Sequence, residues 1–94
     1  MTKIARTAKR FIISGRVQGV GFRYFVRQQA QALGLAGWVR NLPDGRVEAF
    51  VEGPSAQLEQ IEQLLRDGPA VAQVKDVEGS EAAPSLATDF EIRG

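Results

Sequence analysis

The feature that most constrains the fold of this 94-residue chain is a glycine-rich loop between a strand-like segment and a helix-like segment. Residues 10–14, before the loop, are rich in β-branched and aromatic side chains, as is typical of a strand. After the loop, apolar residues recur at the spacing of an amphipathic helix, at Phe22, Phe25, Val26, Ala30 and Leu33. The loop is therefore predicted to lead from a strand into the N-terminus of a helix.

This loop has the composition of an anion-binding turn. The first N–H groups of a helix lack intrahelical partners, and the helix dipole is positive there. Gly15, Gly19 and Gly21 allow the backbone to turn toward a ligand without Cβ clashes. Arg23, in the first helical turn, adds a planar set of donors that suits two phosphate oxygens. The alternative is an ordinary glycine-rich turn with a surface arginine, since the Gly-Lys-Ser/Thr ending of a nucleotide-binding loop is missing.

A second motif follows the predicted helix without a gap: Gly37-Trp38-Val39-Arg40-Asn41, and then an Asp44-Gly45 turn. Together with Gly-Arg-Val-Gln-Gly-Val-Gly-Phe-Arg at residues 15–23, it resembles the signature of the acylphosphatase family. The resemblance runs from about Phe11 through Pro54 and, more weakly, to residues 90–92.

The resemblance implies a small enzyme that hydrolyses the carboxyl–phosphate bond of acyl phosphates. It implies that Arg23 binds phosphate and that Asn41 positions a water molecule, although an asparagine before Leu42-Pro43 also suits a turn. The substrate phosphate-binding loop is then expected to comprise Arg16, Val17, Gln18, Gly19, Val20, Gly21 and Phe22. For Gln18 there are two alternatives: contact of its side chain with the substrate, or contribution of its backbone N–H to the cradle, of which the second is favoured. The Phe22 ring is expected in the core. No metal and no cofactor are expected.

Composition limits the chemistry, because the chain contains no cysteine and no histidine. Cysteine phosphatases, phosphohistidine enzymes, Ser-His-Asp hydrolases and Cys/His zinc sites all need side chains that are missing. An acyl phosphate departs as a carboxylate whose conjugate acid has a pKa of roughly 4, so its release needs no general acid. Phosphoryl transfer then requires mainly positioning and charge neutralisation, which a backbone loop and one arginine supply without metal.

Charge is divided unevenly along the chain. Residues 1–46 hold nine Lys/Arg and one acid, a net charge of +8, whereas residues 47–94 hold three Lys/Arg and ten acids, a net charge of −7. The basic half suits steering of anionic substrates, a nucleic-acid surface or ordinary solvated charge. An RNA-binding module needs exposed aromatics on the central strands, where only Phe11 and Phe50 occur, so no nucleic-acid partner is expected. A non-catalytic acylphosphatase-like domain is the other alternative.

The order of predicted elements indicates an α+β fold of the ferredoxin-like split βαβ type, with two helices on one face of a mainly antiparallel four- to five-stranded sheet. In this topology the first and second strands end at the same edge, so the loop at residues 16–21 and Asn41 are expected to meet. The predicted elements are strands at about Lys9–Arg16, Gly37–Leu42, Arg46–Glu52 and Val71–Glu78, helices at about Phe22–Leu33 and from Pro54 to before Gly68, a loop at Gly79–Thr88 and a short edge strand at Asp89–Arg93. The imperfect alternation of Val71–Glu78 indicates a bulge or an edge position.

Residues 1–8 are expected to form a flexible tail, and residues 9–94 a single acylphosphatase-like domain. No apolar run approaches the roughly 20 residues that span a bilayer, and residues 1–10 lack the apolar region of a signal peptide. The expected protein is a cytoplasmic monomer that acts on a small acyl phosphate and binds neither membrane nor nucleic acid.

Overall fold

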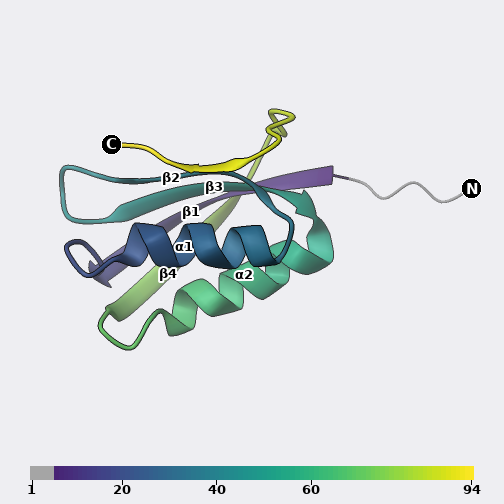
Figure 1. Ribbon diagram of the computed structural model, residues 1–94. Coiled ribbons are helices and arrows are strands. Elements are labelled where there is room, and N and C mark those ends of the chain that lie inside the picture. The colour runs from purple at the N-terminus through teal and green to yellow at the C-terminus, as the bar shows by residue number, and fades with distance from the viewer. Residues whose placement is uncertain (1–5) are drawn as a thin grey trace, which may run out of the picture.

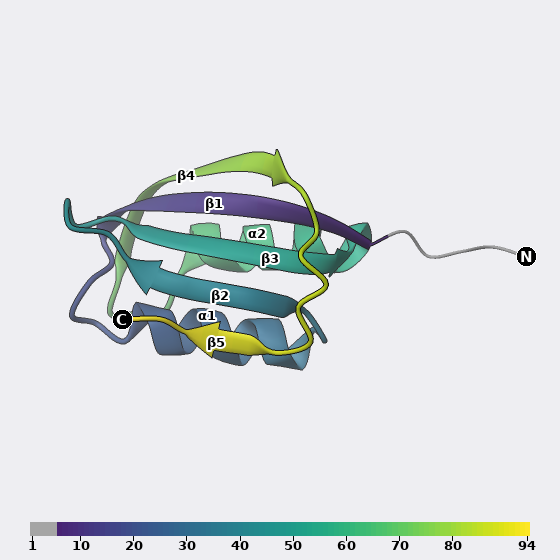
Figure 2. The same ribbon diagram turned by 90° about the horizontal axis from the view of Figure 1, so that it is seen from above.

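A computed structural model, which describes residues 6–94, shows one five-stranded sheet with both helices packed on the same face (Figures 1 and 2). The elements are β1 (Arg6–Arg16), α1 (Phe22–Ala32), β2 (Ala36–Asn41), β3 (Val47–Pro54), α2 (Ser55–Asp67), β4 (Gln73–Ala82) and β5 (Phe90–Ile92). The strand order is β4-β1-β3-β2-β5; only the β2–β5 pair is parallel. The predicted ferredoxin-like α+β fold is confirmed.

The core lies between the sheet and the two helices. Strand alternation directs every second side chain of β1 and β3 toward the helices, whose apolar stripes cover them. The buried side chains of this layer include Phe11, Ile13, Val47, Ala49 and Val51 from the strands, and Val26, Ala30, Leu58, Ile61 and Leu65 from the helices. The stripe of α1 that residue spacing predicted therefore faces the core.

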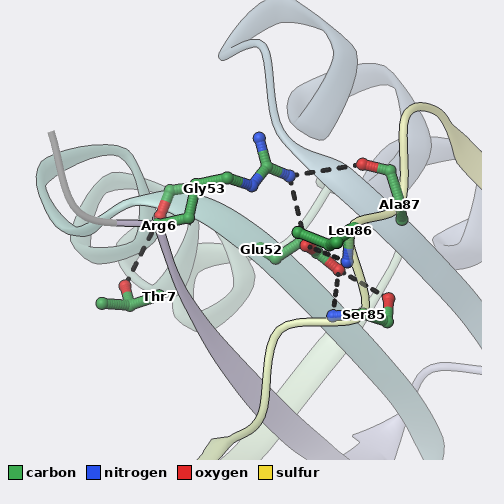
Figure 3. A network of polar contacts seen from close by, with 7 residues as sticks. All are labelled: Arg6, Thr7, Glu52, Gly53, Ser85, Leu86 and Ala87. Carbon is green, nitrogen blue, oxygen red and sulfur yellow. Dashed lines mark hydrogen bonds and ion pairs between the residues drawn. The ribbon is translucent and has the colours of Figure 1, made fainter.

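The segment after β4 crosses the helix-free face of the sheet before it forms β5 beside β2 (Figure 2). A fully buried carboxylate, Glu52 of β3, holds this crossover (Figure 3). It accepts hydrogen bonds from the Ser85 hydroxyl at 2.7 Å, from the Ser85 N–H at 3.1 Å and from the Leu86 N–H at 3.0 Å. Arg6 forms an ion pair with the same carboxylate at 3.2 Å.

The structure corrects three boundaries predicted from sequence. Residues 6–8 belong to β1 and pair with β3, so the tail predicted over residues 1–8 is too long; residues 1–5 lie outside the described residues. Strand β4 continues past Glu78 to Ala82, because its ladder with β1 extends through the polar segment predicted as a loop. Helix α2 begins at Ser55, with Pro54 as the extended residue before it.

Two other expectations about β4 are confirmed. It is an edge strand, and its register with β1 shifts between Ser14 and Gly15. Among residues 6–94, no helix combines the length and the hydrophobicity needed to cross a membrane.

Candidate active site

The topology brings the glycine-rich loop and Asn41 together, as predicted. Because β1 and β2 are both antiparallel to β3, they run in the same direction, and their C-terminal ends lie at one edge of the sheet. The loop that follows β1 and the last residue of β2 meet at this edge, around a cavity of about 90 Å³. The cavity is lined by Val17, Gly19, Gly21, Phe22, Arg23, Tyr24 and Asn41.

The backbone of the loop is shaped by glycine. Gly19 and Gly21 have φ angles of +73° and +75°, in the left-handed region that L side chains rarely adopt. Gly21 immediately precedes α1, whose N-terminus has no side-chain cap within the described residues and no acidic residue in its first turn. The first N–H groups of α1 therefore keep their donor capacity beside the cavity, an arrangement that attracts anions.

Four of the seven residues of the predicted loop line the cavity, and the fourth is Phe22, the first residue of α1. Val17, Gly19 and Gly21 line it, whereas Arg16, Gln18 and Val20 do not. The Gln18 side chain points elsewhere: its Nε2 donates to the backbone oxygens of Leu42, at 2.7 Å, and of Arg46, at 2.9 Å. These two bonds tie the loop to the turn between β2 and β3. Nothing in the residue pattern had indicated this use of the Gln18 amide.

Arg23 carries its charge at the cavity with few competing contacts. Its Nη1 donates to the backbone oxygen of Arg93 at 3.2 Å, and within residues 6–94 it forms no ion pair. A guanidinium has five N–H donors, so most of them remain for a ligand. The contact with Arg93 could not be inferred from the sequence, because it involves a backbone carbonyl at the other end of the chain.

Asn41 supplies the most unusual polar atom of the site. Its side-chain oxygen, Oδ1, is buried and has no hydrogen-bond partner among the described residues. Buried acceptors are almost always paired, because an unmet one costs about 1–3 kcal/mol. Asn41 also lines the cavity, so an amide with unused hydrogen-bonding capacity among the described residues lies beside the loop.

The family profile of acylphosphatases matches residues 9–92, which is nearly the whole chain. This chain belongs to the acylphosphatase family. It is 51% identical over 81 residues to an acylphosphatase from Acaryochloris marina, covering 86% of this chain and 87% of that protein. An acylphosphatase from Moorella thermoacetica is 52% identical over 83 residues, covering 88% and 89% of the two chains. The crystal structure of the acylphosphatase from Bacillus subtilis superposes with a TM-score of 0.91 at 40% identity, covering 94% and 99%.

Side chains of the strands themselves cover the face of the sheet that carries no helix. Glu48 lies between Arg10 and Arg40, with Arg40 Nε at 2.6 Å. Burial raises the pKa of Glu48, but hydrogen bonds from Arg10 and Arg40 outweigh this effect, so its pKa lies below the usual value. Arg40 is thus engaged away from the cavity.

The aromatics of the central strands are also buried. Phe11 of β1 faces the helices with no exposed surface. Phe50 of β3 is stacked on Trp38, with ring centroids 6.0 Å apart, and the Arg93 guanidinium lies 4.8 Å from the Trp38 ring. Along the described length of β1 and β3, no aromatic ring is exposed for base stacking, which argues against the RNA-binding alternative.

Proposed function

We propose that this protein is an acylphosphatase, which hydrolyses the carboxyl–phosphate bond of acyl phosphates to a carboxylate and inorganic phosphate. The observation that carries the proposal is the shared cavity, which brings Arg23, Asn41 and the N-terminus of α1 together, the latter with no side-chain cap from residues 6–94. The relatives with 46–52% identity are themselves named acylphosphatases.

The phosphoryl group binds where the positive groups converge. Backbone N–H groups of the loop and of the first turn of α1 donate to its oxygens, and the Arg23 guanidinium adds charge-assisted bonds of roughly 1.5–3 kcal/mol each. The same groups neutralise the charge that spreads over the equatorial oxygens in the transition state. The loop thus contributes mainly through its backbone, and Arg23 is its charged partner.

The attacking water is held by a hydrogen bond to the side-chain amide of Asn41, which lines the cavity. The water oxygen forms a bond to phosphorus on the side opposite the acyl oxygen, and the bond from phosphorus to that oxygen breaks with its electron pair. Because an amide is a very weak base, the proton of the water passes to an oxygen of the substrate phosphate. The products are a carboxylate and inorganic phosphate.

The leaving carboxylate is a weak base, so the reaction requires no acid to protonate it. An alkyl phosphate monoester releases an alkoxide, which does require an acid or a metal. We therefore expect hydrolysis of acyl phosphates in the presence of EDTA and almost none of monoesters. Initial rates of phosphate release from acetyl phosphate and from an alkyl monoester, with and without EDTA, test this. Metal-dependent activity, or comparable monoester hydrolysis, would contradict the mechanism.

Two variants separate the proposed roles. Asn41→Ala is expected to lower kcat by about 10²–10³, the usual loss for a transition-state contact, while inorganic phosphate still inhibits or binds. Arg23→Ala is expected to lose both turnover and phosphate binding, and Arg23→Lys to restore little, because an ammonium lacks the planar fork of donors. If Asn41→Ala loses phosphate affinity in parallel with rate while keeping its fold by circular dichroism, Asn41 belongs to the phosphate cradle instead.

The proposal includes a monomer that takes no nucleic acid; the second point is supported by Phe11 and Phe50, the aromatic residues of β1 and β3, which are both buried. Light scattering on the active protein tests whether it is a monomer. An electrophoretic mobility shift assay with RNA at several salt concentrations tests whether it binds nucleic acid. The cytoplasmic location stays a prediction from composition.

A further inference from the structure

The cavity is small, about 90 Å³, and it opens to solvent, since Gly19, Gly21 and Tyr24 of its lining are exposed. A substrate whose phosphoryl group occupies this space must leave its acyl group outside, at the mouth. Selectivity for the acyl group is therefore decided by the side chains at the mouth.

Tyr24 is the exposed residue of the lining that carries a side chain. Of the residues that line the cavity, three are exposed, namely Gly19, Gly21 and Tyr24, and the two glycines have no side chain. Tyr24 is 61% exposed, and only two other large hydrophobic residues within 6–94 are exposed, Val71 and Leu86. An aromatic ring left open to solvent beside a cavity is a surface on which a ligand can be desolvated.

The ring of Tyr24 is also held in place. The guanidinium of Arg27, one turn further along α1, lies 5.4 Å from the ring centroid, within the range of a cation–π contact. The residue next to Tyr24 in the same helical turn is Arg23. The ring is thus carried by the same helix as the guanidinium proposed to bind phosphate.

We infer that Tyr24 contacts the acyl group and favours substrates with a flat aromatic acyl group over acetyl phosphate. The inference rests on the proposed function, because it concerns the acyl half of the same substrate. An aromatic acyl group presents a ring face or edge to Tyr24, whereas an acetyl group presents a single methyl. Contacts between aromatic rings are worth enough to change the preference about fivefold.

The test compares kcat/KM for benzoyl phosphate and acetyl phosphate in the wild type, Tyr24→Ala and Tyr24→Phe. Tyr24→Ala is expected to lower the benzoyl-to-acetyl ratio about fivefold, mainly by raising KM for benzoyl phosphate, and Tyr24→Phe to keep most of the preference because the ring remains. Leu86→Ala, which removes an exposed apolar side chain on the crossover, is the matched control. Tyr24→Gln provides a second variant with good helix propensity.

The outcomes distinguish this inference from the proposed function. If the wild type hydrolyses both substrates and Tyr24→Ala and Tyr24→Gln leave the ratio unchanged, the role of Tyr24 is wrong and the proposed function stands. A parallel fall in both rates, with weaker inhibition by inorganic phosphate, would place Tyr24 in the phosphate cradle and also overturn the inference. If the wild type hydrolyses neither substrate, both proposals fail.

Discussion

The Arg23 guanidinium in the first turn of α1 donates a hydrogen bond of 3.2 Å to the backbone carbonyl of Arg93, seventy positions later in the chain. Arg93 follows β5 and is held by its own N–H, which donates to the carbonyl of Val39 in β2 at 2.8 Å. The orientation of Arg23, the arginine proposed to bind phosphate, therefore depends on the edge strand β5 being docked beside β2.

Deletion of Arg93 and Gly94 is expected to weaken phosphate inhibition and raise KM several-fold, because Arg23 loses the carbonyl that orients it. Arg93→Ala is the matched control, since it removes the guanidinium over Trp38 and keeps the backbone carbonyl. Steady-state kinetics with inorganic phosphate as competitor measures KM and the strength of phosphate inhibition in both variants. An equal effect of Arg93→Ala and the deletion would assign the orienting role to the Arg93 side chain.

Gln18→Ala is expected to lower the free energy of unfolding by about 1–2 kcal/mol, because two hydrogen bonds to backbone carbonyls disappear. The freed loop should also bind inorganic phosphate more weakly, since the loop is no longer tied to the β2–β3 turn. Urea denaturation and phosphate competition measure the two effects. Gln28→Ala, at an exposed position of α1, is the control. Unchanged phosphate affinity in a destabilised Gln18→Ala would show that the loop is shaped by its glycines alone.

Acid is expected to loosen the crossover through Glu52. Burial raises the pKa of this carboxyl, but hydrogen bonds from Ser85 and Arg6 outweigh the effect, so its pKa in the folded protein lies below the usual value. A lowered folded-state pKa means that the carboxylate stabilises the fold fully above the unfolded-state pKa of about 4.3. This contribution is lost as the pH falls through the folded-state pKa.

Glu52→Gln should therefore reduce the free energy of unfolding by about 1–3 kcal/mol at pH 7 and flatten its decline below about pH 4.5. Urea denaturation at a series of pH values measures both, with Glu59→Gln on the exposed face of α2 as the control. Glu48 and Glu62 also have lowered pKa values, so part of the acid dependence should persist. A slope identical to that of the wild type would show that Glu52 does not titrate in this range.

Gly37→Ala is expected to destabilise the protein by roughly 3 kcal/mol or more, because overpacking adds to backbone strain. A Cβ at this position would lie 1.9 Å from the carbonyl oxygen of Phe50, and the φ angle is +137°. Gly34→Ala, with a φ of +70° and no described atom within 4 Å of the added Cβ, isolates the conformational cost of about 1 kcal/mol. Thermal or urea denaturation compares the stability of the two variants. Equal losses of stability would contradict the steric explanation for Gly37.

Local sequence was sufficient to predict those helices and strands that follow a short-range residue pattern. Helical spacing predicted α1 to within a residue, and the Asp44-Gly45 turn predicted the hairpin of β2 and β3, because periodicity and turn chemistry act over a few residues. Strand β4 was predicted less well. Most of Gln73–Ala82 is exposed, so its side chains show no clear alternation, and its true end at Ala82 is set by pairing with Ala8 of β1.

The sequence by itself determined the family and the fold class, and it predicted that the glycine-rich loop and Asn41 meet, because these are carried by residue types at characteristic spacing. Only the tertiary structure decided that Tyr24 lines the cavity and Gln18 does not, and it decided three long-range contacts: Gln18 with the Leu42 carbonyl, Glu52 with the Ser85 N–H, and Arg23 with the Arg93 carbonyl. These partners are 24, 33 and 70 positions apart. In each pair one partner is a backbone group, which nearly every residue possesses, so no residue type marks the contact before the chain has folded.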